Sequence, residues 1–216
     1  KYLDVSGLDG VAALASVIAT LAKDERFDLT SVLNTFHDDF FNNYAGQFNF
    51  NIVPEDQIVG SEKYKTYESK FGESEQDGER LRDGSIPYGD YQVLLPNALK
   101  KENSNKMRML ELFEEETDGV MFITLSFALQ PKVAVGGMGT AGVAAYMNIT
   151  LFDEEGKKVF NFTEYATAKK SIPLIKGVPV LDLDKIKPLC EDAAANLMAD
   201  MTKKMPKLIK KVTKKF

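Results

Sequence analysis

The sequence predicts an α/β (α+β) sandwich: a central mixed sheet with a C-terminal antiparallel hairpin, helices packed on the sheet, and a long closing C-terminal helix. Three observations predict this fold class. Residues 120–129 and 143–152 place apolar side chains on one face with a period of two, the spacing of a β-strand. An acidic turn with a glycine, residues 153–157, separates the second run from a third at residues 159–168. Apolar residues at helical spacing precede and follow these runs.

Length and composition indicate one ordinary globular domain. The chain has 216 residues, of which 44% are hydrophobic and 27% are charged, and it can bury a substantial core. We expect residues 1–201 to form a single α/β domain with a surface excursion at residues 64–90, followed by a basic amphipathic tail at residues 202–216. No apolar run reaches the roughly 18 residues that span a bilayer. Because the sequence starts at Lys1, we expect a processed form or a fragment, with any export signal or lipid anchor upstream.

Two helices are predicted before the sheet. Residues 1–5 are expected to end a strand, and a helix is expected over residues 11–23. A second helix is expected over residues 31–44, because its apolar side chains recur at helical spacing. His37 lies at the edge of that apolar face, so we expect a half-buried structural histidine, with a functional one as the alternative. The apolar face consists of Leu33, Phe36, Phe40 and Tyr44.

The next stretch predicts a strand, a short helix and an excursion. Residues 48–53 alternate like a strand, and Pro54 with the two acids after it predicts the start of a short helix. Residues 64–90 are polar, acidic and glycine-bearing, and a loop of that length is a candidate partner-contact segment. Ser104 can cap a helix that runs through Glu116. The apolar positions of that helix are Met107, Leu110 and Phe113.

A glycine-rich stretch at residues 136–142 separates the first two predicted strands. It contains Gly137-x-Gly139-x-x-Gly142, a match to the dinucleotide-binding fingerprint, in which glycines let a pyrophosphate approach the start of a helix. The acid at Asp153 follows too soon after Gly142 for the helix and second strand that this motif requires. We therefore interpret the stretch as a hairpin loop, with a nucleotide- or small-molecule-binding enzyme as the alternative. The loop is also a candidate contact site, formed by Gly136, Gly137, Met138, Gly139 and Thr140.

The chain is expected to end in a long helix with a basic tail. Residues 171–183 read as extended, Asp184 caps the closing helix, and Pro206 is expected to kink it. Residues 202–216 carry a net charge of +7, whereas residues 1–201 carry 20 basic and 32 acidic residues, a net −12. Such a tail can contact an anionic membrane or an acidic groove of a partner; the alternative is that its apolar side completes the core. Its lysines are Lys203, Lys204, Lys207, Lys210, Lys211, Lys214 and Lys215.

Residues that carry chemistry are few. Cys190 is the only cysteine, so no internal disulfide can form, and any histidine-based triad or metal site would depend on His37 alone. Adjacent acids such as Glu154 and Glu155 are not placed across a cleft as a general acid and base would be. The sequence therefore predicts no catalytic, cofactor-binding or metal-binding residue. The acidic body argues against nucleic acid as a partner.

Two motifs resemble those of bacterial envelope lipoproteins. Asp118-Gly119-Val120 opens the first predicted strand, and Leu151-Phe152-Asp153-x-x-Gly156-x-x-Val159 forms the hairpin after it. In these motifs and in the order of its elements, the chain resembles relatives of the curli-secretion lipoprotein, the penicillin-binding-protein activator lipoproteins and the amino-terminal domain of TolB. The resemblance implies an exported α/β sandwich in the periplasm, lipidated on an upstream cysteine and anchored to the outer membrane, with neither enzyme activity nor a cofactor.

The expected function is that of a non-enzymatic assembly or scaffolding component of the cell envelope. The resemblance implies that such a protein works through contacts with other envelope proteins or with copies of itself, and it carries over no catalytic residues. Two alternatives remain: an enzyme that uses the Gly137–Gly142 stretch, and a peripheral protein that binds a membrane surface through the basic tail.

Overall fold

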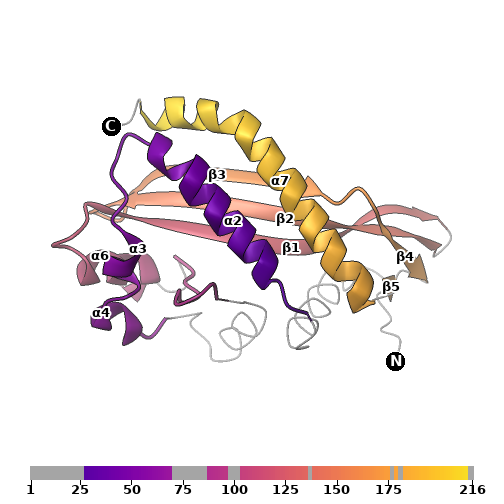
Figure 1. The fold of residues 1–216 in the computed structure, drawn as a ribbon, viewed down its shortest axis with the longest axis horizontal. Helices are drawn as coiled ribbons and strands as arrows, with labels where there is room; N and C mark the ends of the chain where they lie inside the picture. Colours follow the sequence, from indigo (N-terminus) through magenta and orange to yellow (C-terminus); the bar gives the residue numbers. More distant parts are fainter. Residues whose placement is uncertain are drawn as a thin grey trace. The chain divides into compact units, whose positions relative to one another are not determined.

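The structure, a computed structural model, confirms the predicted α+β fold. Helices pack on an antiparallel sheet, and a long helix closes the chain (Figure 1). The predicted strand at residues 1–5, the predicted helix at residues 11–23 and most of the predicted excursion lie outside the described residues. The structure describes residues 27–69, 87–96, 103–135, 138–175, 178–179 and 182–213.

The chain forms two compact units. The first unit contains the described parts of Lys1–His37, Thr124–Met147 and Thr163–Lys204. The second unit contains the described parts of Asp38–Ile123, Asn148–Phe162 and Met205–Phe216. Because these boundaries fall inside long helices and strands, several of these elements contribute residues to both units.

The sheet has five strands in the order β1-β2-β4-β5, with β3 also paired to β2. β2 pairs antiparallel with β4 from Met138 opposite Ile175 to Ala141 opposite Ile172, and β4 pairs antiparallel with β5. A mixed sheet was expected, but the sheet is antiparallel. Only short segments separate β1, β2 and β3 in the sequence, and parallel pairs would require long crossovers. The strands are β1 (Gly119–Val135), β2 (Met138–Asp153), β3 (Lys158–Thr167), β4 (Ile172–Ile175) and β5 (Val178–Pro179).

The predicted turn at residues 153–157 is confirmed. The Asp153 N–H donates to the Lys157 carbonyl at 3.0 Å, and the Gly156 N–H donates to the Asp153 carbonyl at 2.9 Å. The Asp153 carboxylate also accepts from the backbone N–H groups of Glu155 and Lys157, at 3.1 and 2.8 Å. Gly156 has a φ of 70°, in the left-handed region that favours glycine. β2 and β3 therefore form the antiparallel hairpin that the sequence predicts.

The predicted second helix is confirmed to within one residue, as α2. The Asp28 carboxylate accepts from the Thr30 N–H at 2.8 Å where the helix begins, and Phe36, Phe40 and Tyr44 are buried as expected. The described helices are α2 (Thr30–Asn43), the 3-10 turn η1 (Ala45–Gln47), α3 (Glu55–Ile58), α4 (Glu62–Lys65), α6 (Asn105–Leu112) and α7 (Leu183–Val212).

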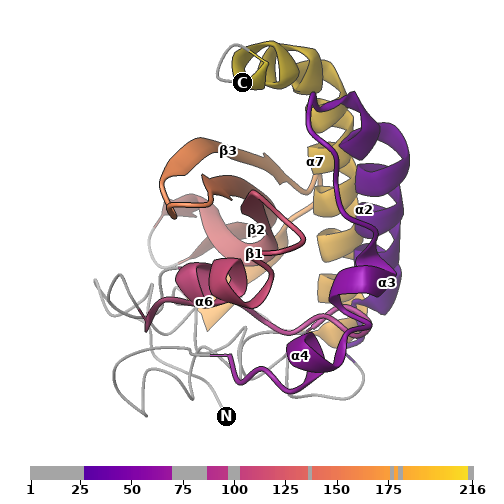
Figure 2. The same ribbon diagram turned by 90° about the vertical axis from the view of Figure 1, so that its left-hand side faces the viewer.

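In the first unit, the helices cover one face of the sheet. Figure 2 shows α7 and the start of α2 on the same side of the strands. The odd-numbered residues of β2 from Ala141 to Met147 are buried, as are Leu197 and Met201 of α7. Since successive side chains of a strand point to opposite faces, the odd-numbered positions of β2 define the helix-covered face of this unit.

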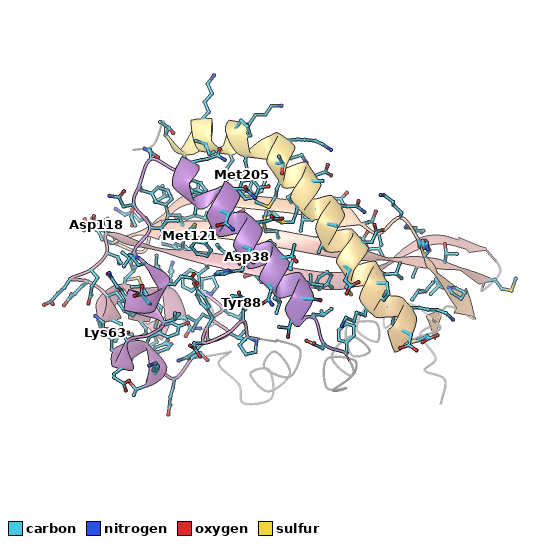
Figure 3. The ribbon with its side chains drawn as sticks, viewed as in Figure 1. Asp38, Lys63, Tyr88, Asp118, Met121 and Met205 are labelled. Carbon is cyan, nitrogen blue, oxygen red and sulfur yellow. The ribbon has the colours of Figure 1, made fainter. Side chains whose placement is uncertain are left out.

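In the second unit, a separate apolar cluster joins the sheet to the short helices. The rings of Phe122 in β1 and Phe152 in β2 meet edge to face, with centroids 6.0 Å apart. α4 and α6 supply the rest of the cluster, and the inner side of the last α7 turns, including Met205, is also buried (Figure 3). The cluster consists of Tyr64, Met109, Phe113, Phe122 and Phe152.

Two local predictions are wrong. The predicted strand at residues 48–53 is irregular, and Phe48 instead stacks on Phe50, with centroids 5.0 Å apart, and on Phe160 of β3, at 6.0 Å. The excursion was expected to begin at Tyr64, but Tyr64 is buried in the second unit's core. α7 runs through Pro206 without a break in the helix, and the predicted kink at this proline stays a prediction.

Candidate functional site

The interiors of the two units offer little chemistry. Among the described residues, no three His, Cys, Asp or Glu side chains are close enough to hold a metal ion. Every buried side-chain nitrogen or oxygen in that part of the chain has a hydrogen-bond partner. Cys190 is buried in α7, and burial, together with the nearby Glu191, raises the pKa of its thiol to about 12. A thiol with that pKa is protonated at neutral pH and is a poor nucleophile. His37 is half-buried, as expected for a structural histidine.

The glycine-rich stretch is mostly strand, so the interpretation of residues 136–142 as a loop is wrong for Met138 onward. Gly136 and Gly137 lie outside the described residues. Met138, Gly139 and Thr140 belong to β2 and lie opposite Ile175, Leu174 and Pro173 of β4. The prediction failed because these residues pair with β4, which is distant in the sequence. This pairing gives the glycine-containing residues a neighbouring strand. Of this set, Met138 has a strongly exposed side chain, with 71% of its surface accessible.

The dinucleotide interpretation loses its structural basis at Gly142. That motif needs a helix to start after its last glycine, so that the helix end can face a phosphate. In the structure the chain continues from Gly142 as strand to Asp153. The alternative of an enzyme built on the Gly137–Gly142 stretch therefore has no phosphate-binding geometry among the described residues.

A nucleotide screen gives an expected null result. We expect the melting temperature of the purified chain to stay unchanged with NAD, ATP, GTP or FMN in excess, because β2 offers no helix end to a phosphate. A ligand at a hundredfold excess over its Kd would stabilise the folded state by about 2.7 kcal/mol through mass action. For a chain of this size such stabilisation raises the melting temperature by roughly 5–10 °C. A rise of that size with any nucleotide would contradict the strand interpretation.

Gly142 has a different role: the side chain of Lys132 lies over it. A Cβ atom placed on Gly142 would meet the Lys132 Cε at 2.5 Å. Lys132 crosses from β1 over β2, and its ammonium donates to the Ala168 carbonyl at 2.9 Å. The Ala168 N–H in turn donates to the Val143 carbonyl at 2.8 Å. The absence of a side chain at Gly142 thus lets one lysine connect three adjacent segments of the first unit.

For this reason, two glycine substitutions should lower the free energy of unfolding by different amounts. Gly142→Ala displaces only the flexible end of Lys132, so we expect it to lower the free energy of unfolding by less than about 1 kcal/mol. Gly119→Ala would place its Cβ 2.6 Å from the Phe152 carbonyl oxygen, a backbone atom that cannot move freely, and we expect a loss of about 1–3 kcal/mol. Urea unfolding of both variants measures the difference. An equal or larger loss for Gly142→Ala would contradict this arrangement.

A pair of stacked tyrosines lies on the other face of the first unit's sheet. Tyr146 of β2 and Tyr165 of β3 stack with ring centroids 5.5 Å apart and ring planes at 22°. The Gln130 side-chain amide of β1 donates to the Tyr146 hydroxyl. Tyr165 remains 56% exposed, and Met138 and Tyr165 are the large hydrophobic side chains exposed among the described residues. We call the surface formed by Gln130, Lys132, Met138, Tyr146 and Tyr165 the tyrosine face.

The positions along β2 place these side chains on one face of the sheet, with Met138 at the start of the strand and Tyr146 eight residues further along. Met138, Gly142 and Tyr146 are separated by even numbers of residues, so they share one face of the strand. The positions between them, including Ala141, Val143 and Ala145, are buried on the helix-covered face. Of the tyrosine face, the sequence singled out only Met138. The stacked pair could have been found by counting back from the predicted turn at Gly156, which places Tyr146 and Tyr165 on adjacent strands at nearly the same level.

The predicted tail is the last part of α7. Its apolar side completes the core, which is the alternative that the sequence left open beside a contact surface. In the second unit, Met205, Leu208 and Val212 are buried, and Lys207 and Lys210 are exposed. In the first unit, Lys203 and Lys204 are exposed but paired, Lys203 with Asp200 at 2.9 Å and Lys204 with Glu164 at 2.6 Å. The Lys211 side chain, Lys214 and Lys215 lie outside the part of the chain that can be described.

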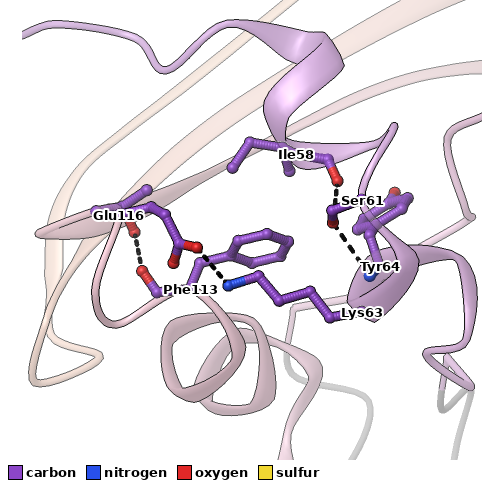
Figure 4. Close-up of polar contacts among 7 residues, drawn as sticks. Ile58, Ser61, Lys63, Tyr64, Phe113 and Glu116 are labelled. Carbon is purple, nitrogen blue, oxygen red and sulfur yellow. Dashed lines mark hydrogen bonds and ion pairs between the residues drawn. The ribbon is translucent and has the colours of Figure 1, made fainter.

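Polar contacts in the second unit are structural. The Lys63 ammonium lies 2.5 Å from the Glu116 carboxylate and 4.5 Å from the centre of the Phe113 ring (Figure 4). The Ser61 hydroxyl donates to the Ile58 carbonyl at 2.6 Å and accepts from the Tyr64 N–H at 3.3 Å, which caps α4. These contacts hold α4 against the end of α6.

Tyrosines connect residues 87–96 to the helices of the same unit. The Tyr64 hydroxyl accepts from the Gln92 N–H at 2.9 Å, and burial raises the pKa of Tyr64. The Tyr91 hydroxyl donates to the Glu55 carboxylate; burial, and then this hydrogen bond, raise the pKa of Tyr91 well above its usual range. Both hydroxyl groups therefore stay protonated at physiological pH and act as hydrogen-bonding groups within the fold.

Comparisons with known proteins add no relative. Comparison of the chain with protein-family models, with curated proteins and with solved structures found no match. None of the helices in the described ranges is both long enough and apolar enough to cross a membrane.

Proposed function

We propose that this chain is a non-enzymatic assembly or scaffolding component of the bacterial cell envelope, exported, lipid-anchored at the outer membrane, and active through protein–protein contacts made by the tyrosine face. The observation that supports contact through this face is the exposure of Tyr165 and Met138, at 56% and 71%. The envelope location is supported by the resemblance of the Asp118-Gly119-Val120 and Leu151–Val159 motifs to envelope lipoproteins.

The tyrosine face has the physical properties of a protein-contact surface. Tyrosine offers a large, partly apolar ring and a polar hydroxyl, and it loses little conformational entropy on binding because it has few rotatable bonds. Here stacking on Tyr146 already restricts the Tyr165 ring, and the Gln130 hydrogen bond holds Tyr146. A flexible methionine such as Met138 adapts to the shape of a partner. The face therefore combines a rigid aromatic element with an adaptable apolar one.

The proposal can be tested by the size of the native complex. We expect the wild-type chain, extracted with mild detergent from the envelope fraction of cells that produce it naturally, to migrate in native electrophoresis as a species larger than the free chain. The double variant Met138→Ser/Tyr165→Ser should lose that species, since both exposed contacts are removed. Lys158→Ser, an exposed position of β3 in the second unit, is the control and should retain it.

Two results would overturn the proposal. One is recovery of the wild-type chain outside the envelope fraction, or as the free chain alone. The other is a complex that the double variant retains, provided that the double variant melts at the same temperature as the wild type. Because both substituted side chains are exposed, we expect the change in melting temperature to be small.

A further inference from the structure

The last turns of α7 present lysines on the side opposite a buried stripe. Met205, Leu208 and Val212 recur at helical spacing and are buried in the second unit. Lys207 and Lys210 are three residues apart, so they lie on one side of the helix, and both are exposed. Neither forms an ion pair with any described residue, in contrast to Lys203 and Lys204. We call Lys207 and Lys210 the lysine face.

The helix supplies no acidic side chain beyond Asp200 that could neutralise the lysine face. No acidic residue occurs in the sequence after Asp200, and residues 202–216 carry seven lysines and no arginine. The rest of the chain carries a net charge of −12. An approaching polyanion is therefore attracted at this end of α7 and repelled by most of the remaining surface.

We propose that the lysine face binds the anionic surface of a phospholipid membrane, and that it does so without inserting apolar side chains. The apolar stripe of this segment is already buried in the fold, so charge is the attraction that remains. Lysine clusters bind anionic lipid headgroups as hydrated point charges, and each lysine near such a surface strengthens binding by about fivefold. The binding is therefore electrostatic and weakens as salt rises.

The composition favours a membrane over a protein or a nucleic acid. Arginine has the planar fork that binds a carboxylate or a phosphate with two parallel hydrogen bonds, and it is the usual residue where a protein or nucleic acid is recognised with defined geometry. A segment with seven lysines and no arginine lacks that geometry but suits a diffuse layer of headgroup charge. The lysine face and the tyrosine face share no residue, so this proposal is tested independently of the protein contacts.

Vesicle sedimentation with the full chain tests the proposal. We expect the chain to sediment with vesicles of phosphatidylcholine and phosphatidylserine at low salt, and not with vesicles of phosphatidylcholine alone. Raising the salt to a concentration at which the Debye length is about 3 Å should release it. The variant Lys207→Glu/Lys210→Glu should bind the anionic vesicles at least about tenfold more weakly, since two attractions become repulsions.

A control with the same change of net charge separates local from overall charge. Lys157→Glu/Lys158→Glu alters two exposed lysines at the β2–β3 turn instead of in α7, and should bind as the wild type does. Equal binding of the wild type to neutral and anionic vesicles would overturn the proposal. So would equal weakening by the two double variants, because binding would then follow net charge. Sedimentation of a folded Lys207→Glu/Lys210→Glu variant at the wild-type level would also overturn it.

Discussion

Replacing Phe40 with alanine is expected to lower the free energy of unfolding by about 3–5 kcal/mol. Phe40 is among the most deeply buried side chains of α2, with 1% of its surface exposed, and its ring meets Phe41 edge to face at 5.4 Å. Truncation removes the transfer free energy of the ring and leaves a cavity that the surrounding residues fill only in part. For a chain of this length, the melting temperature should fall by roughly 6–20 °C.

Phe41→Ala is the matched control for this experiment. Phe41 is the next residue of the same helix and is only half-buried, so its truncation should cost clearly less. If Phe40→Ala does not fold, Phe40→Leu preserves most of the volume and should cost about 1.5 kcal/mol or less. Chemical denaturation followed by circular dichroism measures all three. A loss for Phe41→Ala as large as that for Phe40→Ala would show that the buried face of α2 has been misplaced.

Replacing Asn105 with alanine is the second change with a large expected effect, about 2–4 kcal/mol. Asn105 is the first residue of α6 and is fully buried. Its side-chain oxygen accepts from the Tyr67 hydroxyl at 2.7 Å, and its side-chain nitrogen donates to the Leu95 carbonyl at 2.8 Å. The substitution leaves both partners without this hydrogen bond in a partly buried setting, and each such group costs about 1–3 kcal/mol.

Tyr67→Phe separates the two hydrogen bonds. It removes only the bond to the Asn105 oxygen and keeps the bond to Leu95, so we expect a loss of about 1 kcal/mol. Asn161→Ala, an exposed amide of β3 in the same unit, should cost less than about 1 kcal/mol despite its own hydrogen bonds. If Asn105→Ala unfolds in urea at the same midpoint as Asn161→Ala, then the Asn105 side chain does not hold Tyr67 and Leu95 to α6.

The sequence predicts the elements whose signals are local. The hairpin around Gly156 depends on one turn, and α2 depends on a cap and a periodic apolar face, so both were predicted to within about one residue. A strand was predicted at Phe48 because Phe48, Phe50 and Ile52 alternate as strand residues do. The prediction is wrong because alternation alone does not supply a neighbouring strand. The aromatic rings there pack on each other and on Phe160 instead.

The glycine-rich stretch was predicted as a loop and is a strand from Met138 onward, the reverse of the error at Phe48. Local rules predict a loop for a run of glycines, but Ile172 and Leu174 of β4 pair with Ala141 and Gly139 and make the run a strand. That pairing joins residues about thirty positions apart, and no local pattern specifies it. The stacking of Tyr146 on Tyr165 also requires the register of two strands, although the predicted turn supplied enough information to place both tyrosines at one level.

Photo-crosslinking in intact cells tests the central claim, that this chain acts through contacts at the tyrosine face. A photoreactive amino acid at position 138 or 165 should give a discrete crosslinked species in cells that produce the chain naturally. The same residue at position 158 should not give that species. Crosslinks at position 158 that equal those at positions 138 and 165, or no crosslinks at positions 138 and 165, would contradict the account.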